Sequence, residues 1–495
     1  MSPAELDAQL KKARESLQFN RFTEALDLYV PLVQHTTHPA IWFEYSRAAS
    51  GSGDFELADQ IWGQMISRDP GNPALLSALA REYAGISLFD KAGELFAKAA
   101  NLEPGNINAQ ISLASHLTRA NSVADARGTV NKCLELDPSN EWARYLSSHL
   151  DRRENKFEEA EKNFRDLLAA SPKDQKLASA SHLELARIYD LTGRFDEAMT
   201  ELKEAKRLAA PTLPIEMQRK FFDQRREHLL RTTKSLPKSI FDTWNTTFPP
   251  DARSPAPPLA FLGGHLRSGT TLLERILDAH PRVAAYDEPL AFQTVAPFVD
   301  ITAPIMPGAA LNSMRQRYLK NMTKDSGPPE DGKVLVDKNP GATAFIPALL
   351  RIFPEMRILL ALRDPRDVMV SSFFILPTHY MHLSLDRLAQ NYSCVMDVWL
   401  AVRDWHGVNW METRYEDVVA DLQKEGSRVT QFLGLDWDAN QARFHENNRK
   451  KAVKNYNEVT KPVYTKAIGR WQAYEKYLTP ILPVLEPYCR EFGYA

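Results

Sequence analysis

The sequence predicts two structural classes in one chain: an N-terminal α-helical solenoid, followed by an α/β domain with a parallel sheet. Three observations predict this arrangement. A 34-residue period runs through the N-terminal part. A proline-rich stretch near residue 250 then interrupts helix and strand patterns alike, and a strand, a glycine-bounded loop and a helix follow at once. The 495 residues leave room for about three domains.

Composition and charge exclude several classes of protein. The 61 basic and 63 acidic residues give a net charge of −2, which argues against bulk attraction to nucleic acid or to an anionic membrane. The three cysteines, Cys133, Cys394 and Cys489, lie too far apart in sequence to indicate a disulfide framework or a zinc motif. The sequence has no apolar run near ~18 residues and no apolar core of a signal peptide at its start, so we expect a cytoplasmic protein.

The period is carried by small and turn-forming residues. Alanines recur every 34 residues, and prolines follow each of them at the same interval. The alanines are Ala58, Ala92, Ala126 and Ala160, and the prolines are Pro70, Pro104, Pro138 and Pro172. Small alanines let paired helices approach closely, and each proline ends the second helix of its pair. With weaker copies around Ala25 and Ala198, about six helical hairpins are expected.

This pattern resembles the tetratricopeptide repeat in its period and in its residues. One unit carries Trp42, Tyr45, Ala58, Trp62 and Pro70. The resemblance implies a solenoid over residues 1–210, whose concave surface binds a peptide or a partner protein. A dimerisation arm, which would make the chain a homodimer, remains equally open.

A second boundary is predicted from composition. After Ala198 the period lapses, and a basic amphipathic stretch from Lys206 to Lys238 follows. Five prolines then crowd between Pro249 and Pro258, where neither helix nor central strand can continue. We therefore predict a helical and proline-rich linker over residues 211–256 and an α/β domain over residues 257–495.

The start of that domain has the features of an anion-binding loop. An apolar strand begins at Leu259, the glycine-rich loop runs from Gly263, and a helix follows Thr271. Such a loop turns backbone N–H groups and a helix N-terminus towards a phosphate. The spacing from Gly264 to Gly269 is that of a P-loop, but Thr270 stands where its lysine belongs, which disfavours an ordinary ATP or GTP site.

The same loop resembles that of sulfotransferases, which use 3′-phosphoadenosine 5′-phosphosulfate (PAPS) as donor and release 3′-phosphoadenosine 5′-phosphate (PAP). Its sequence is most similar to that of tyrosylprotein sulfotransferases and their bacterial relatives. The resemblance implies a P-loop-like α/β fold and a 5′-phosphosulfate site formed by Arg267, Ser268, Gly269, Thr270, Thr271 and Leu272.

Further motifs of that family follow in order. Arg363 and Ser371 match its 3′-phosphate motif, Tyr415 matches the tyrosine beside the adenine ring, and Arg470 matches a basic residue that faces the cofactor phosphates. An arginine fork with a hydroxyl group suits a terminal phosphate.

The resemblance also implies the catalytic groups. Lys338 and Arg267 are expected at the bridging and sulfuryl oxygens, where they stabilise the developing charge. Glu288, which follows Arg267 by 21 residues, matches the catalytic glutamate that takes the proton of the acceptor. Asp287 remains open as an alternative base, and a helix-capping role remains open for either carboxylate. His265 and His280 are expected to be structural, and no metal ion is expected.

The acceptor is the least specified part of the prediction. A tyrosine in a peptide or protein, held by the groove of the repeats, fits the motifs best, while carbohydrates and small alcohols remain open. One rival is a P-loop kinase with Asp337 as its magnesium ligand. Another is a tetratricopeptide scaffold with a nucleotide-binding but inactive domain.

Overall fold

The computed structural model describes residues 3–494 except residues 20, 87, 325–329, 331 and 447–466. Contacts divide the chain into two compact units. One comprises Met1–Leu136 and Leu290–Pro297, and the other comprises Asp137–Pro289 and Phe298–Ala495. Each unit is described by itself.

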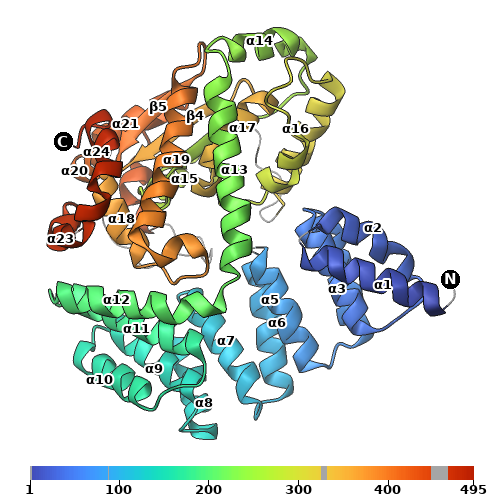
Figure 1. Cartoon of the computed structure of the whole chain (residues 1–495), viewed down its shortest axis with the longest axis vertical. Helices are drawn as coiled ribbons and strands as arrows, with labels where there is room; N and C mark the ends of the chain where they lie inside the picture. Colours follow the sequence, from blue (N-terminus) through green and yellow to red (C-terminus); the bar gives the residue numbers. More distant parts are fainter. Residues whose placement is uncertain are drawn as a thin grey trace. The chain divides into compact units, whose positions relative to one another are not determined.

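Six antiparallel helix pairs precede residue 210 in the described part of the chain (Figure 1). The first unit holds α1 (Pro3–Gln18), α2 (Phe22–Val33), α3 (Pro39–Gly51), α4 (Phe55–Arg68), α5 (Pro73–Gly85), α6 (Phe89–Leu102), α7 (Ile107–Arg119) and α8 (Val123–Leu136). The second unit holds α9 (Glu141–Arg153), α10 (Phe157–Ala169), α11 (Gln175–Leu191) and α12 (Phe195–Ala209). The predicted helical hairpins are therefore confirmed.

The periodic residues do in the structure what their chemistry predicts. The periodic alanines of the second helices are fully buried, and they are Ala25, Ala58, Ala92, Ala126, Ala160 and Ala198. The periodic prolines follow the ends of α4, α6, α8 and α10. A further 34-residue series caps the first helices: the side chains of Asn72, Asn106, Asn140 and Asp174 accept hydrogen bonds from backbone N–H groups in the next turn.

The division into two units by contacts does not test the predicted domain boundaries. By contacts, the helix pairs α9/α10 and α11/α12 group with the sheet, and residues Leu290–Pro297 group with the first four pairs. The ranges 1–210, 211–256 and 257–495 therefore stay predictions about domain boundaries.

The second unit contains a parallel sheet. Within the described residues its five strands are β1 (Leu259–Gly264), β2 (Val283–Asp287), β3 (Val334–Lys338), β4 (Arg357–Leu362) and β5 (Trp410–Arg414), in the order β2-β3-β1-β4-β5. All adjacent pairs are parallel. The predicted α/β domain with a parallel sheet is confirmed, and all five strands end at one edge.

Helices pack against the sheet and share its apolar core. Leu273 and Leu277 of α15 (Thr270–Asp278) and Val429 of α21 (Leu422–Phe432) share one apolar core with β1 to β4. The remaining α-helices are α13 (Ile215–Ser235), α14 (Ile240–Thr247), α16 (Gly308–Met322), α17 (Ile346–Ile352), α18 (Pro365–Phe373), α19 (Leu385–Arg403), α20 (Tyr415–Ala420), α23 (Glu475–Leu478) and α24 (Leu482–Glu491). The short 3-10 turns are η1 (Ala210–Thr212), η2 (Pro250–Ala252), η3 (Phe292–Thr294), η4 (Ala296–Phe298), η5 (Pro340–Phe345), η6 (Tyr380–Leu383), η7 (Ala439–Glu446), η8 (Arg470–Tyr474) and η9 (Thr479–Ile481).

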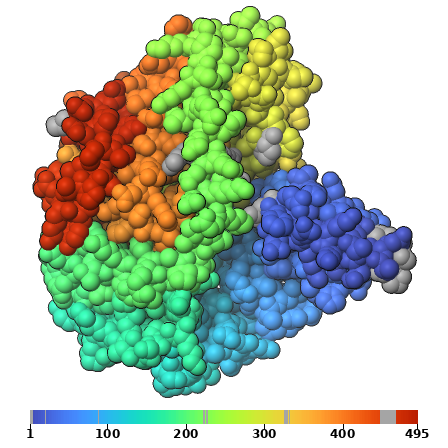
Figure 2. Space-filling view, in the orientation of Figure 1, coloured from blue at the N-terminus to red at the C-terminus, as the bar shows by residue number. Residues whose placement is uncertain are grey.

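The basic stretch before the prolines forms the long helix α13. It contacts α19, and Gln218 and Asp223 accept hydrogen bonds from the backbone N–H and the hydroxyl group of Tyr380. Figure 2 shows its outer face open to solvent on the side drawn. No helix in the described residues has the length and apolar character needed to span a bilayer.

The last hairpin of the repeats, α11 and α12, forms hydrogen bonds with later segments of the second unit. Asp190 of α11 accepts hydrogen bonds from Arg470 Nε at 3.0 Å and from the Tyr474 hydroxyl at 2.7 Å. Lys206 of α12, which is 3% exposed, donates to the carbonyl of Ile375 at 2.6 Å. These polar contacts fix the orientation of α11 and α12 on this unit.

We expect Asp190→Asn to destabilise the second unit by about 1.5–3 kcal/mol, because it leaves a poorly solvated guanidinium without its carboxylate. The measurement is the shift in the chemical-denaturation midpoint of that unit. Asp196→Asn is the matched control, because Asp196 joins the same two segments through an exposed pair with Lys476 and should change the midpoint little. Equal shifts in both variants would contradict the larger contribution to stability that we assign to Asp190.

Candidate active site

The predicted site residues lie where parallel strands end. The glycine loop follows β1, Asp287 ends β2 and Glu288 follows it, and Lys338 ends β3. Arg363 and Tyr415 follow β4 and β5 directly. In an open parallel sheet ligands bind at this edge, where the strand order changes direction, and β1 lies centrally between β3 and β4. The sheet thus gathers residues that are up to 148 positions apart (267 and 415).

Two glycines allow the loop to approach its neighbours closely. Gly264 has a φ of +139°, and a Cβ there would lie 2.4 Å from the carbonyl oxygen of Ala361. Gly269 has a φ of +88°, and its Cβ would lie 2.6 Å from the ring of Tyr415. Gly269 also precedes α15 and, as a glycine, has no side chain to cap it. The backbone N–H groups of Thr270, Thr271 and Leu272 therefore form a helix N-terminus without a side-chain cap, the kind of helix end at which proteins often bind anions.

Three residues of the predicted phosphate site contact one another. Arg267 Nε donates to the hydroxyl oxygen of Ser371 at 2.9 Å, and an Arg363 amine donates to the carbonyl of Arg267 at 3.2 Å. The guanidinium of Arg363 lies 4.9 Å from the centre of the Tyr415 ring. Arg363 Nε is buried without a hydrogen-bond partner among the described residues, so a donor here is available to a ligand.

Nearby charged residues are engaged elsewhere. Arg366 pairs with Asp364 at 2.7 Å. Asp367 accepts hydrogen bonds from the N–H groups of Gly469 and Trp471, both at 2.8 Å. The side chain of Arg470 pairs with Asp190 at 2.8 Å, and among the described residues it has no hydrogen bond or ion pair with Arg363 or Ser371. Its role at the cofactor phosphates stays a prediction, and residues 461–466 of the same motif lie outside the described residues.

Carboxyl groups of three residues act on the ammonium of Lys338. Asp287 and Lys338 are register partners on adjacent strands, so their side chains emerge on the same face of the sheet. The Lys338 ammonium, whose side chain is 1% exposed, forms ion pairs with Asp287 and, at 3.4 Å, with Glu288. Burial lowers the pKa of Lys338, but Asp287, Glu288 and Glu274 outweigh it and raise the pKa above its usual value. Lys338 is therefore a fixed cation at neutral pH.

Glu288 is held in an unusual backbone conformation beside it. Glu288 has a φ of +49°, and its N–H donates to the carbonyl of Lys338 at 2.7 Å. Arg267, in the glycine loop, also has a positive φ, of +72°. Such backbone strain costs about 1–3 kcal/mol per residue and is typical of functional positions. The side chain of Glu288 is 29% exposed against 19% for Asp287, so Glu288 is the more accessible carboxylate.

Asp337 is placed differently from a magnesium ligand. Its side chain points to the opposite face of β3 from Lys338, because successive residues of a strand alternate. It is fully buried and accepts a hydrogen bond from the Tyr318 hydroxyl of α16. Burial raises the pKa of Asp337 to about 7. Among the described residues, no group of three or more His, Cys, Asp or Glu side chains is arranged to hold a metal ion.

The two histidines of this region have structural partners. His265 is 3% exposed and contacts the carbonyl of Leu266 at 2.9 Å and Asn391 Oδ1 at 3.0 Å. Burial lowers the pKa of His265. His280 accepts a hydrogen bond from the N–H of Arg282 at 3.0 Å. Both fit the structural role expected from the sequence.

Sequence reasoning missed two residues of the site. Thr343 of η5 accepts a hydrogen bond from the Gly264 N–H at 2.9 Å and thereby holds the start of the loop. Glu274 of α15 is 2% exposed and interacts electrostatically with Asp287 and Lys338. Its sequence signal was a carboxylate between Leu273 and Leu277, inside the apolar stripe of the helix.

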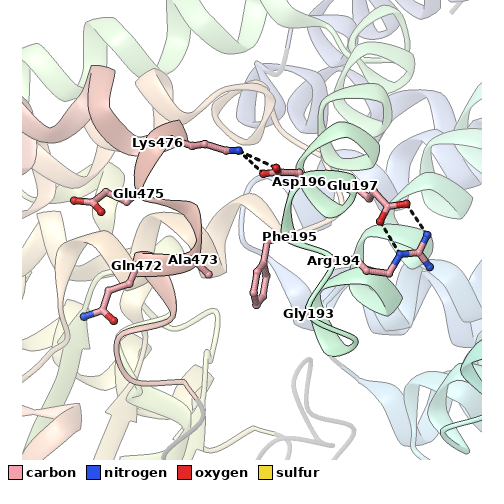
Figure 3. Close-up of a pocket in the computed structure, with 9 residues that line it drawn as sticks. All are labelled: Gly193, Arg194, Phe195, Asp196, Glu197, Gln472, Ala473, Glu475 and Lys476. Atoms are coloured by element: carbon pink, nitrogen blue, oxygen red, sulfur yellow. Dashed lines mark hydrogen bonds and ion pairs between the residues drawn. The ribbon is translucent and has the colours of Figure 1, made fainter.

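A pocket of about 510 Å³ lies elsewhere in the second unit (Figure 3). Residues 193–197 at the start of α12 face residues 472–476 across it. Lys476 pairs with Asp196 at 2.7 Å, and Arg194 pairs with Glu197 at 2.5 Å. None of the predicted site residues lines this pocket, and four of its charged side chains pair with one another.

Comparison with known proteins gives the family of this domain. Residues 258–439 match the model of the sulfotransferase family, and residues 151–212 match a tetratricopeptide-repeat model. An uncharacterized protein of Aquifex aeolicus is 25% identical over 259 residues, which are 46% of this chain and 32% of that protein. Protein-tyrosine sulfotransferase 1 of Danio rerio is 24% identical over 240 residues, 43% of this chain and 65% of that protein. The chain thus spans between 32% and 65% of the length of these relatives.

The solved structures with similarity include a sulfotransferase domain and MamA. The sulfotransferase domain of the Synechococcus PCC 7002 olefin synthase is 19% identical, with a TM-score of 0.32 over 45% of this chain and 90% of that domain. MamA is 19% identical, with a TM-score of 0.28 over 34% of this chain and 95% of that protein. From the two family matches, the chain contains a sulfotransferase-family domain and tetratricopeptide repeats.

Proposed function

We propose that this chain is a PAPS-dependent sulfotransferase that transfers a sulfuryl group to a hydroxyl acceptor, a tyrosine in a peptide or protein. The observation that carries the proposal is the cluster of Arg267, Ser371 and Arg363 beside the glycine loop. The family match of residues 258–439 and the protein-tyrosine sulfotransferases among the relatives support it.

The residues at the strand ends fit this cofactor. Gly264 and Gly269 let the loop lie against Ala361 and Tyr415, where a Cβ would clash, and the N-terminus of α15 suits the 5′-phosphate. Arg363 has a buried donor to spare for the 3′-phosphate, and Ser371 adds a hydroxyl group. Tyr415, against Gly269, offers an aromatic face to the adenine.

The chemistry divides between these residues. When bound, PAPS supplies a sulfuryl group whose S–O bond to the 5′-phosphate breaks as the acceptor oxygen bonds to sulfur, leaving PAP. Lys338 and Arg267 stabilise the charge on the leaving phosphate with fixed cations. Glu288 takes the proton of the acceptor hydroxyl group. Asp287 holds Lys338 through its ion pair on the same face of the sheet.

The repeats are the part of the chain that we propose for binding the peptide or a partner protein. Their helix pairs are of the kind that forms a concave protein-binding surface. A screen of tyrosine peptides against carbohydrates and small alcohols tests the acceptor class once donor binding is established. Sulfation of sugars in place of peptides would overturn the tyrosine assignment and leave the enzyme class in place.

The test of the cofactor site is calorimetric binding of PAP, AMP and ATP with magnesium. We expect PAP to bind without metal and at least ~10-fold more tightly than AMP, because charge-assisted hydrogen bonds to the 3′-phosphate contribute about 1.5–3 kcal/mol each. A preference for ATP with magnesium would favour the kinase reading. Absence of binding to all three would favour the inactive scaffold.

Arg363→Ala should weaken PAP binding by about 10- to 100-fold and AMP binding much less, since it removes the proposed 3′-phosphate contact. Arg357→Ala is the matched control, because Arg357 begins the strand that Arg363 follows and lies at its far end. Equal losses of PAP and AMP binding in Arg363→Ala would refute the 3′-phosphate role.

A further inference from the structure

The helix that starts at the glycine loop carries a buried carboxyl group that the proposed mechanism does not use. Glu274 lies in the second turn of α15, next to the Leu273 that packs on the sheet. Its side chain is nearly fully buried, and Oε2 has no hydrogen-bond partner among the described residues. The nearest cation is Arg275, whose Nε lies 3.6 Å from Oε2.

Glu274 shares its surroundings with the transfer site. Asp287 and Lys338 emerge on the face of the sheet that α15 covers, because Ala285 and Val336, two residues earlier in each strand, belong to the core shared with α15. Lys338 already forms ion pairs with Asp287 and Glu288, and Glu274 is a third carboxyl group acting on it. With Arg275 beside Glu274, two cations face three carboxylates in this buried site, so one negative charge is left without a cation.

Further charged groups lie on α15 and on the elements that pack against it. Asp278, one turn further along the helix, accepts a hydrogen bond from the Ala285 N–H at 3.1 Å. The elements α21 and η7 also pack against α15. Their charged side chains are Lys424, Glu425, Arg428, Arg443, His445 and Glu446, of which Glu425 pairs with Arg428 and His445 with Glu446. Burial, followed by the charge of Asp287, raises the pKa of Glu274 to about 7.

We propose that Glu274 is a positioning residue of the transfer site, which carries its proton when the donor is bound and thereby leaves the ammonium of Lys338 to the donor. In its neutral form, Glu274 adds no negative charge near the N-terminus of α15 and does not compete for Lys338. In its ionised form it does both, and an anionic donor then binds less well. Donor binding near neutral pH therefore takes up a proton from the solvent. This inference rests on the proposed function, because it concerns the same site.

The experiment compares PAP binding to the full-length wild-type chain and to Glu274→Gln by calorimetry between about pH 6 and about pH 8.5. Glutamine keeps the size of the side chain and imitates its neutral form at every pH. We expect the wild-type affinity to fall by about 3- to 10-fold more than that of Glu274→Gln over this range, because ionisation of Glu274 opposes binding. Titrations in buffers of different ionisation enthalpy should show proton uptake that the variant lacks.

Asp278→Asn is the matched control, since it removes a second buried carboxylate from the same helix. It should keep a pH dependence of the wild-type kind, displaced towards lower pH, because the charge of Asp278 contributes to the raised pKa of Glu274. Identical pH dependence in wild type and Glu274→Gln would overturn the inference and leave the proposed function intact. Failure of every variant to bind PAP would overturn the proposed function, and the inference with it.

A measurement without ligand tests the charge state of Glu274 separately from donor binding. The folded chain holds the Glu274 pKa above its value in the unfolded chain, so the unfolded chain ionises first as the pH rises. The wild type should therefore lose stability relative to Glu274→Gln between about pH 5 and about pH 8, seen as a growing gap in Tm. A gap that stays constant would contradict a neutral Glu274.

Discussion

Glu288→Gln should lower the sulfuryl-transfer rate by about 10²- to 10⁴-fold, because it removes the group that takes the acceptor proton. Glutamine has nearly the same shape and cannot accept that proton. The structure makes Glu288 suitable for this role, since its carboxylate is more exposed than that of Asp287 and its backbone is held at a φ of +49°. The measurement is the single-turnover rate at saturating donor and acceptor, with PAP affinity recorded separately.

Asp287→Asn is the informative comparison for that result. It changes the adjacent carboxylate by the same single charge, and Asp287 contacts Lys338 as Glu288 does. A smaller loss in Asp287→Asn than in Glu288→Gln supports Glu288 as the base. Full activity in Glu288→Gln would contradict the assignment of Glu288 as the base. A larger loss in Asp287→Asn than in Glu288→Gln would assign that role to Asp287.

Lys338→Met should have an effect of similar size on the transfer rate, about 10²- to 10³-fold, because it removes a buried, preorganised cation from the site. Lys338 is almost fully buried and keeps its charge at neutral pH, since the carboxylates of Asp287 and Glu288 raise its pKa against the effect of burial. The cation is aligned before the reaction begins, so its loss should appear in the rate more than in PAP affinity. Single-turnover transfer assays measure the rate and PAP calorimetry measures the affinity, both on the same preparation.

Lys333→Met is the matched control for this change. Lys333 directly precedes β3, at the opposite end from Lys338, and pairs only with Glu330 among the described residues, at 3.1 Å. It should retain the wild-type rate, and a thermal melt of both variants checks that the fold is intact. A Lys338→Met variant that transfers at the wild-type rate would remove Lys338 from the mechanism.

Much of the fold could be predicted from the sequence because it rests on local patterns. The 34-residue spacing of alanine, proline and capping asparagine specifies helix contacts and helix ends within one hairpin. The strand, loop and helix around Gly264 and Gly269 are likewise contiguous, and their glycines adopt the positive φ angles that such a loop requires. Contacts of this kind depend on neighbours in the chain, which periodicity can indicate.

Side-chain partners were harder to predict because they depend on elements far apart in sequence. The motif around Arg470 predicts a phosphate contact, which stays a prediction, and it gave no sign that its guanidinium pairs with Asp190, 280 residues away on a helix of the repeats. The local sequence of Arg470 contains no information about that helix. Glu274 was missed for a related reason, since its importance arises only where α15 covers the ends of β2 and β3.

By itself, the sequence determined the repeat hairpins, the parallel-sheet class and the glycine loop that follows the first strand, because periodicity and motif order are properties of the chain. The tertiary structure alone decided which of the predicted site residues meet. The sheet order β2-β3-β1-β4-β5 brings Asp287 beside Lys338, and Arg267 lies against Ser371 and Arg363. It also decided that Asp337 faces away from Lys338 and is buried against Tyr318, while α15 covers Lys338 with a further carboxyl group. Strand alternation and burial set the charge state of each group, and both arise only once the chain is packed.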